Sequence, residues 1–159
     1  MSGPQHGMDM SDTLVLRPIS AEDEAAWRPV WQGYLRFYDT ELPEEVLAST
    51  FTRLTSGEPS EPRGILAWRG GAAVGLVHYL FHRHCWRVEN VCYLQDLFTT
   101  PEARGHGVGR ALISAVYDAA DAAGSRAVYW HTAENNARAR ALYDRIGRKS
   151  PFIRYNRVL

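Results

Sequence analysis

A short glycine-rich stretch, residues 104–112 (RGHGVGRAL), separates a strand-like segment from a helix-like one. Its three glycines, Gly105, Gly107 and Gly109, allow backbone conformations that other residues seldom adopt, and apolar residues at helical spacing follow them. The first N–H groups of a helix have no partner within the helix, and the helix dipole favours negative charge there. The stretch therefore predicts a strand–loop–helix unit whose loop can hold an anion.

Two familiar phosphate-binding loops do not match this stretch. A P-loop continues with Lys and then Ser or Thr after its second spaced glycine, where this chain has Arg110 and Ala111. A dinucleotide-binding fingerprint requires its third glycine at position 110, which is arginine. The stretch alone leaves open a glycine-rich turn that binds no ligand.

Hydrophobic periodicity predicts a mixed α/β chain around this unit. The expected strands are residues 14–19, 63–69, 72–84, 86–98, 127–132 and 152–159. The expected helices are an aromatic-rich one from about residue 20, then 43–54, 108–123 and 134–146. A glycine pair at 70–71 predicts a hairpin, Gly124 and Gly147 predict helix ends, and Pro29 predicts a kink or a late helix start.

Length and composition limit the class of protein. We expect one domain over residues 12–159 of the 159, after a disordered leader at residues 1–11. Lys and Arg balance Asp and Glu at 18 each, with no basic run, which argues against nucleic acid as a partner. No stretch is apolar enough for a membrane span, and Cys85 and Cys92 lack metal-ligand spacing. We expect a soluble, cytoplasmic protein with reduced thiols and no metal.

Two sequence blocks resemble the GNAT superfamily of acyl-CoA N-acyltransferases. The family signature is Gln/Arg-x-x-Gly-x-Gly/Ala, which Arg104, Gly107 and Gly109 fill within residues 92–112. A second block, NNARARALYDRIG at residues 135–147, follows at the family's spacing. Segments such as WQGYLRFY and CYLQDLF are most similar to the histone and polyamine acetyltransferase branch. The resemblance implies a central mixed sheet in which two parallel strands splay apart around acetyl-CoA.

The resemblance also implies which residues hold acetyl-CoA. Six consecutive residues would grip the pyrophosphate through backbone amides: Gly105, His106, Gly107, Val108, Gly109 and Arg110, preceded by Arg104. The main chain of Leu97, Phe98 and Thr99 would pair with the pantetheine arm, and Asn136 and Ala139 would contact its other side. The alternative for Asn136 is that it only caps a helix.

Tyr143 stands where the family has its proton donor. An amine that attacks a thioester expels a thiolate, and a proton donor near the sulfur assists that step. The proton transfer is uphill by about 2 kcal/mol from the reference pKa values of tyrosine and a thiol. Periodicity alone favours a packed aromatic beside Leu142 and Ile146, and the two motifs together favour the proton donor instead.

The general base is less sharply indicated. An acidic residue commonly stands in the resembled branch where this chain has Gln95, whose amide cannot accept the proton. Asp96 is the neighbouring candidate, although strand alternation points it to the opposite face from Gln95 and allows a structural role. Glu89 is a further candidate on the same segment, with a solvated charge as its alternative.

The resemblance also implies that the first helices line the acceptor slot. Trp31, Tyr34 and Tyr38 share one helical face and would form its walls, with core packing as the alternative. The residues Tyr129, Trp130 and His131, together with Gln95, are the other candidates for acceptor contact.

We therefore expect an acetyl-CoA-dependent N-acetyltransferase that acts by direct attack in a ternary complex. Its acceptor would be a polyamine-like small molecule, an amino acid or a lysine side chain. The alternatives are a non-catalytic acyl-CoA-binding or regulatory module, and an enzyme that acetylates protein N-termini or lysines. The exposed strand expected at residues 152–159 also predicts a homodimer.

Overall fold

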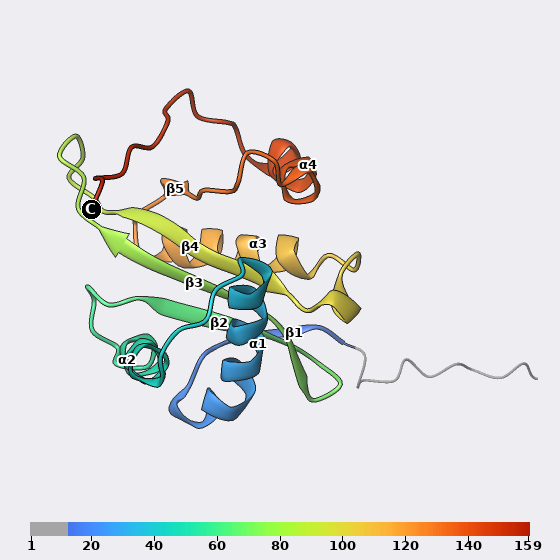
Figure 1. The fold of residues 1–159 in the computed structure, drawn as a ribbon. Helices are drawn as coiled ribbons and strands as arrows, with labels where there is room; N and C mark the ends of the chain where they lie inside the picture. Colours follow the sequence, from blue (N-terminus) through green and yellow to red (C-terminus); the bar gives the residue numbers. More distant parts are fainter. Residues whose placement is uncertain (1–12) are drawn as a thin grey trace, which may run out of the picture.

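The computed structural model describes residues 13–159, so the expected leader at residues 1–11 lies outside the described part. One five-stranded sheet runs in chain order from β1 to β5, with β1 to β4 antiparallel and β5 parallel to β4 (Figure 1). The strands are β1 Val15–Pro18, β2 Arg63–Arg69, β3 Ala72–His82, β4 Val91–Thr99 and β5 Val128–Tyr129. The helices are α1 Glu24–Phe37, α2 Glu44–Leu54, α3 Val108–Ala122 and α4 Ala137–Ile146, with 3-10 turns η2 Ala21–Asp23 and η3 Pro101–Ala103. The expected mixed α/β sheet is confirmed.

Two apolar clusters lie on opposite faces of the sheet. On one face, α1 and α2 cover Leu66, Leu76 and Phe98. On the other face, α3 packs over residues such as Val77 and Cys92, and the side chains of α4 join this cluster at its edge (Figure 1). Each strand residue therefore belongs to the α1 face or to the α3 face.

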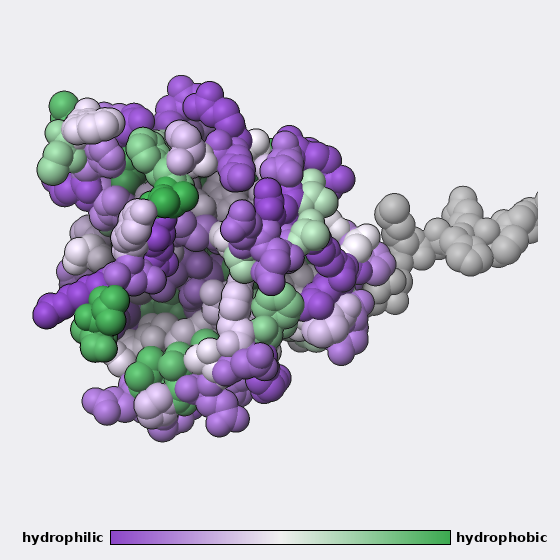
Figure 2. All heavy atoms as spheres, turned by 45° about the horizontal axis from the view of Figure 1, so that its top comes forward, coloured by the Kyte–Doolittle hydropathy of each residue, from purple (hydrophilic) through white to green (hydrophobic). Residues whose placement is uncertain are grey.

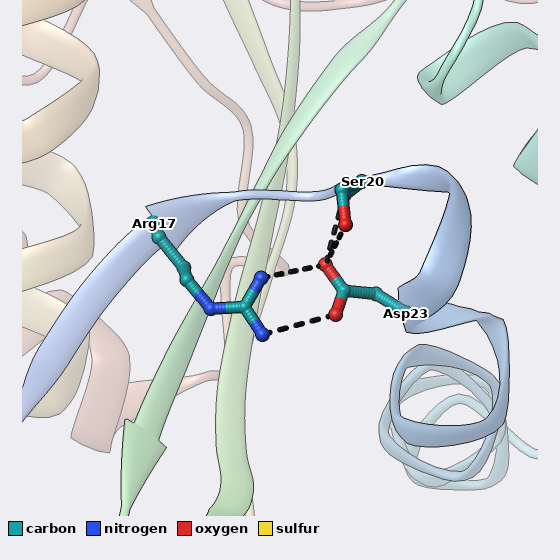
Figure 3. A network of polar contacts seen from close by, with 3 residues as sticks. All are labelled: Arg17, Ser20 and Asp23. Carbon is teal, nitrogen blue, oxygen red and sulfur yellow. Dashed lines mark hydrogen bonds and ion pairs between the residues drawn. The ribbon is translucent and has the colours of Figure 1, made fainter.

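A carboxylate organises the start of α1 (Figure 3). Asp23 accepts two hydrogen bonds from the Arg17 guanidinium at 2.9 and 3.0 Å, and its Oδ2 also accepts from the backbone N–H of Ser20 at 2.8 Å. Burial alone would raise the pKa of Asp23, but the hydrogen bonds from Arg17 and Ser20 outweigh burial and lower it. The network ties β1 to α1.

The expected turns are confirmed by backbone conformation. Gly70 and Gly71 join β2 to β3 with φ of 57° and 75°, as a two-residue hairpin with positive φ at both positions requires. Gly124 follows α3 with φ of 69°, and the N–H of Ser125 bonds back to the carbonyl of Ala120. Pro29 lies inside α1, which begins five residues earlier at Glu24, so the expected late start is wrong.

The strands expected beyond β4 are wrong or shorter than expected. Residues 152–159 form no strand but an exposed segment without regular structure, because no strand among residues 13–159 lies beside them to share backbone hydrogen bonds. The strand expected over residues 127–132 is reduced to Val128–Tyr129, and β4 begins at Val91 rather than at residue 86. Within residues 13–159, no helix has the length and hydropathy of a membrane span.

Candidate active site

The edge of β4 is open beside α4. Strand β5 pairs with β4 only through Cys92 with Val128 and Tyr93 with Tyr129. From Leu94 to Thr99 no further residue of β5 accompanies β4, so the two parallel strands part there. Unpaired backbone N–H and C=O groups of a strand edge can bond to an extended ligand. The sequence resemblance implies two splayed parallel strands, and β4 and β5 diverge in this way.

The glycine-rich loop follows β4 after the 3-10 turn η3. Gly105 and Gly107 have left-handed φ of 82° and 78°, and Gly107 is the N-cap of α3. A Cβ built on either glycine would meet no atom within 4 Å, so this backbone borders open space. The Nε of Arg104 donates to the carbonyl of Thr99 at 3.3 Å, which ties the loop to the end of β4. A loop so shaped can approach an anion closely at a helix N-terminus.

The remaining loop residues differ in their surroundings. Val108 is buried in the core beneath the loop, whereas His106 and Arg110 are exposed. A Cβ on Gly109 would lie 3.9 Å from both Leu142 and the Thr99 hydroxyl, so α3 passes close to α4 and β4 here. A hollow of about 470 Å³ lies beside the loop, lined by residues that include Gly33, Phe37, Phe98, Thr100 and Arg104.

Asn136 caps α4. Its side-chain oxygen accepts from the N–H of Ala139 at 3.4 Å, and its amide donates to the hydroxyl of Thr132 at the same distance. The capping alternative raised from the sequence is thus present, and the two residues expected to contact pantetheine are bonded to each other.

Tyr143 extends from α4 into a half-buried position on the α3 side of the opening. Its ring lies 5.5 Å from that of Trp130, which also packs against Tyr117 on α3. Burial raises the pKa of Tyr143, and the nearby hydroxyl of Tyr38 raises it further. The phenol is therefore protonated at neutral pH and available as a proton donor.

A β-bulge brings Asp96 to the α1 face. His78 pairs with Asp96 and the next residue of β3, Tyr79, pairs with Leu94, which leaves Gln95 as an extra residue on β4. Before the bulge, Cys92 and Leu94 face α3. After it, Asp96 is buried on the α1 face, where Phe98 also packs, and Gln95 is exposed.

Two tyrosines, Tyr34 of α1 and Tyr38 directly after it, lie near Asp96. The pKa of Tyr34 is raised by burial and then by the negative charge of Asp96. The pKa of Tyr38 is raised by burial and by the same carboxylate. Their rings are 5.0 Å apart. The structure thus brings together Asp96, Tyr34, Tyr38 and Tyr143.

The other acceptor candidates are distributed around this group. Trp31 is a core residue, stacked on Trp27 at 5.0 Å. Tyr129 is partly exposed and stacks on Tyr93 at 4.9 Å, and the hydroxyl of Tyr93 lies 3.3 Å from Nδ1 of His131. Glu89 is exposed in the loop before β4, where it pairs with Arg87.

Sequence reasoning missed two polar contacts beneath Asp96. Its Oδ2 lies 2.9 Å from Nδ1 of His78, whose Nε2 accepts from the indole of Trp27 at 2.9 Å. The available signal was His78 itself, a polar residue within the apolar run GLVHYLF. Among residues 13–159, no group of three or more His, Cys, Asp or Glu side chains is arranged to hold a metal.

Hydrophilic side chains dominate the face that α4 and the C-terminal segment border, with hydrophobic ones in separate groups (Figure 2). The apolar side chains exposed in that segment include Phe152, Ile153 and Tyr155.

Two parallel strands of a mixed sheet part here, next to a helix that begins at a glycine-rich loop. This is the architecture of an acyl-CoA acyltransferase. The chain belongs to the acetyltransferase (GNAT) family, whose family model matches residues 25–147, most of the chain. It is accordingly an acyltransferase.

Individual relatives agree with this assignment. The D-amino-acid N-acetyltransferase of Saccharomyces cerevisiae is 40% identical over 160 residues, covering 99% of this chain and 98% of that protein. An aminoglycoside N-acetyltransferase in complex with CoA has the same fold, with a TM-score of 0.79 at 16% identity over 92% of this chain and 95% of that one. A ribosomal-protein-alanine N-acetyltransferase from Brucella melitensis gives 0.78 at 16% identity over 92% and 100%.

Proposed function

We propose that this protein transfers the acetyl group of acetyl-CoA to the primary amine of a small molecule, by direct attack in a ternary complex. The observation that carries the proposal is the group formed by Asp96, Tyr34, Tyr38 and Tyr143, where the open edge of β4 faces α4. This group offers a proton acceptor and a proton donor with two tyrosines beside them. Such a pair is what acyl transfer to an amine requires.

Acetyl-CoA fits the open edge and the loop above it. Backbone amides of residues 105–110 would bind the pyrophosphate, because Gly105 and Gly107 leave space for it. The backbone of residues 97–99 would bond to the pantetheine amides along the edge that β5 leaves open. Ala139 and the α4 N-cap Asn136 would border the other side.

Asp96 and Tyr143 divide the proton transfers between them. Asp96 would accept a proton from the amine as its nitrogen bonds to the acetyl carbon, and Tyr143 would donate a proton to the departing sulfur. Tyr143 holds its proton until the sulfur departs, because burial and Tyr38 raise its pKa, although the same shift makes the phenol a weaker acid. No acyl-enzyme is needed, and the buried Cys92 has a pKa raised by burial to about 11, which makes it a poor nucleophile.

A D-amino acid is the acceptor that we favour, because the yeast relative that carries that name matches nearly the whole chain. Polyamine-like amines, lysine side chains and protein N-termini remain alternatives. An exposed aromatic group formed by Tyr93, Tyr129 and His131 would border such an acceptor. We place the enzyme in the cytoplasm, in keeping with its free Cys85 and Cys92.

Thiol release from acetyl-CoA tests both the activity and the acceptor. Purified protein would be assayed with D-amino acids, their L-enantiomers, polyamines, aminoglycosides and lysine peptides, with mass spectrometry of the products. Acetylated D-amino acids, formed at least tenfold faster than the L-forms, are the expected products. Acetyl-CoA binding without amine-dependent thiol release would instead support the non-catalytic module.

We also propose a homodimer. The C-terminal residues 152–159 expose Phe152, Ile153, Tyr155, Val158 and Leu159 without regular structure. The outer edge of β5 has no neighbouring strand among the described residues. A second copy would bury these side chains and supply strand partners.

A further inference from the structure

A buried chain of hydrogen bonds runs from α1 through β3 to Asp96 on β4. Trp27 is fully buried and His78 is 2% exposed, and both belong to the packing between α1 and the sheet. The indole Nε1 donates to Nε2 of His78 at 2.9 Å, and Nδ1 of His78 lies 2.9 Å from Oδ2 of Asp96. Buried polar groups are costly unless they are paired, so these three residues hold one another in place.

The direction of these bonds follows from the chemistry of indole. An indole N–H can only donate a hydrogen bond, so Nε2 of His78 must be an unprotonated acceptor. The ring proton therefore resides on Nδ1 and is donated to Asp96. A second proton on Nε2 would break the bond with Trp27. His78 is thus a neutral donor, and the negative charge of Asp96 has no cationic partner in this arrangement.

The groups that face Asp96 come from β3 and from the C-terminal end of α1. On β3 it meets His78, and at the end of α1 it acts on Tyr34 and on the C-cap residue Tyr38. Two of these are phenols, and His78 is the nitrogen donor described above. Oδ1 of Asp96 remains outside the bond with His78.

We propose that His78 and Trp27 are positioning residues, which hold Asp96 ionised and oriented for the amine by keeping the imidazole neutral. This inference rests on the proposed role of Asp96 as proton acceptor. In the reaction the nitrogen–carbon bond forms, the amine proton passes to Asp96, the carbon–sulfur bond breaks and the sulfur takes the proton of Tyr143. Exchange through water restores both side chains.

Trp27→Phe is the sharpest test, because it removes the N–H and keeps an aromatic ring. His78 can then bind a second proton and form an ion pair with Asp96, which weakens the carboxylate as a base. The ratio of variant to wild-type kcat/KM should be near one at pH 8.5 and fall about tenfold at pH 5.5, because only in the variant is Nε2 of His78 free to take up a proton. Trp68→Phe is the matched control, since the Trp68 Nε1 is buried without a hydrogen-bond partner among the described residues. Its ratio should stay constant over this range.

Two substitutions at position 78 complete the test. His78→Leu should lower kcat about 10- to 100-fold with KM for acetyl-CoA within about twofold, a share of what a general base contributes. His78→Asn retains a donor near the position of Nδ1 and should recover most of that loss. Thermal unfolding of each variant verifies that it is folded; if His78→Leu is not, the Trp27→Phe profile decides.

Asp96→Asn distinguishes the two proposals. If it retains wild-type kcat, the base assigned under the proposed function is wrong. If it loses activity while Trp27→Phe keeps the wild-type pH profile, Asp96 stands as the base and the positioning roles of His78 and Trp27 are overturned.

Discussion

Burial raises the pKa of the tyrosines at the candidate site. Tyr143 is half-buried beside the ring of Trp130, and burial is the main cause that raises its pKa. Asp96 is buried too, but the hydrogen bond that it accepts from His78 offsets the cost of burying its carboxylate and adds no positive charge. Residue type alone would not distinguish either side chain from its exposed counterparts.

Tyr143→Phe should lower kcat by about 100-fold or more, because it removes the proton donor while the ring still packs on Trp130. The KM for acetyl-CoA should change less than about threefold. Steady-state thiol release measures both constants. Tyr117→Phe, on the far side of Trp130, is the control and should leave kcat within about twofold. Equal losses in the two variants would contradict the role of Tyr143.

Asp23→Asn should lower the free energy of unfolding by about 2 kcal/mol at pH 7, because Asp23 accepts charge-assisted bonds from Arg17. The folded-state pKa of Asp23 is lowered, so its stabilisation is present above the unfolded-state pKa and is lost as the pH falls through the folded value. Urea unfolding measured from pH 7 to pH 3 should show that the difference in the free energy of unfolding between wild type and variant becomes smaller below about pH 4.

The control for this prediction is Glu61→Gln. Glu61 pairs with Arg53 at 3.9 Å on the exposed surface, and such pairs contribute less than about 1 kcal/mol. If the loss of unfolding free energy in Asp23→Asn is the same at every pH, the prediction is contradicted.

At the scale of elements, the loop before α3 and the bulge in β4 shape the site. The loop follows from local sequence, since only glycine adopts the conformations at positions 105 and 107 without strain. The bulge arises from the way β4 pairs with β3. The sequence of β4 alone does not reveal this pairing. Both lie at the end of β4 that β5 leaves open.

Gly107→Ala should raise the KM for acetyl-CoA about tenfold, because a side chain at φ of 78° strains the loop by about 1–2 kcal/mol and displaces its amides. Gly57→Ala is the matched control, since Gly57 has φ of 74°, open space around it and a position outside the site. It should destabilise the fold comparably and leave KM unchanged. Steady-state kinetics and thermal unfolding of both variants measure this difference.

For the whole molecule, the homodimer that we propose depends on the exposed C-terminal segment, residues 152–159. Its apolar side chains stand free of the two core clusters, although large apolar groups are normally buried. The sequence pattern predicted a strand at residues 152–159, and that prediction is wrong. It could not supply the neighbouring strand without which no strand forms.

Removal of residues 150–159 should convert the proposed dimer to a monomer. Multi-angle light scattering over a hundredfold range of concentration measures the mass of full-length and shortened protein. A full-length protein that has the monomer mass of 18.0 kDa at every concentration would contradict the dimer. Paired measurement of thermal unfolding shows whether the shortened protein remains folded.

Local chemistry allowed much of the fold to be predicted from sequence. The hairpin at Gly70 and Gly71, the end of α3 at Gly124 and the loop at residues 104–109 all depend on backbone conformations that glycine permits. Strand β5 was overestimated because its residues are apolar enough for a strand, but the strand length depends on its partner.

The sequence by itself determined the family, the glycine loop and the alternation of strands and helices, because these depend on residue types at short spacing. Only the tertiary structure decided the surroundings of Asp96. Alternation along β4 would place Asp96 on the α3 face with Cys92 and Leu94, and the extra residue Gln95 turns it to the α1 face instead. There it meets His78, 18 residues away in the chain, because pairing between strands rather than neighbouring sequence determines which side chains share a face.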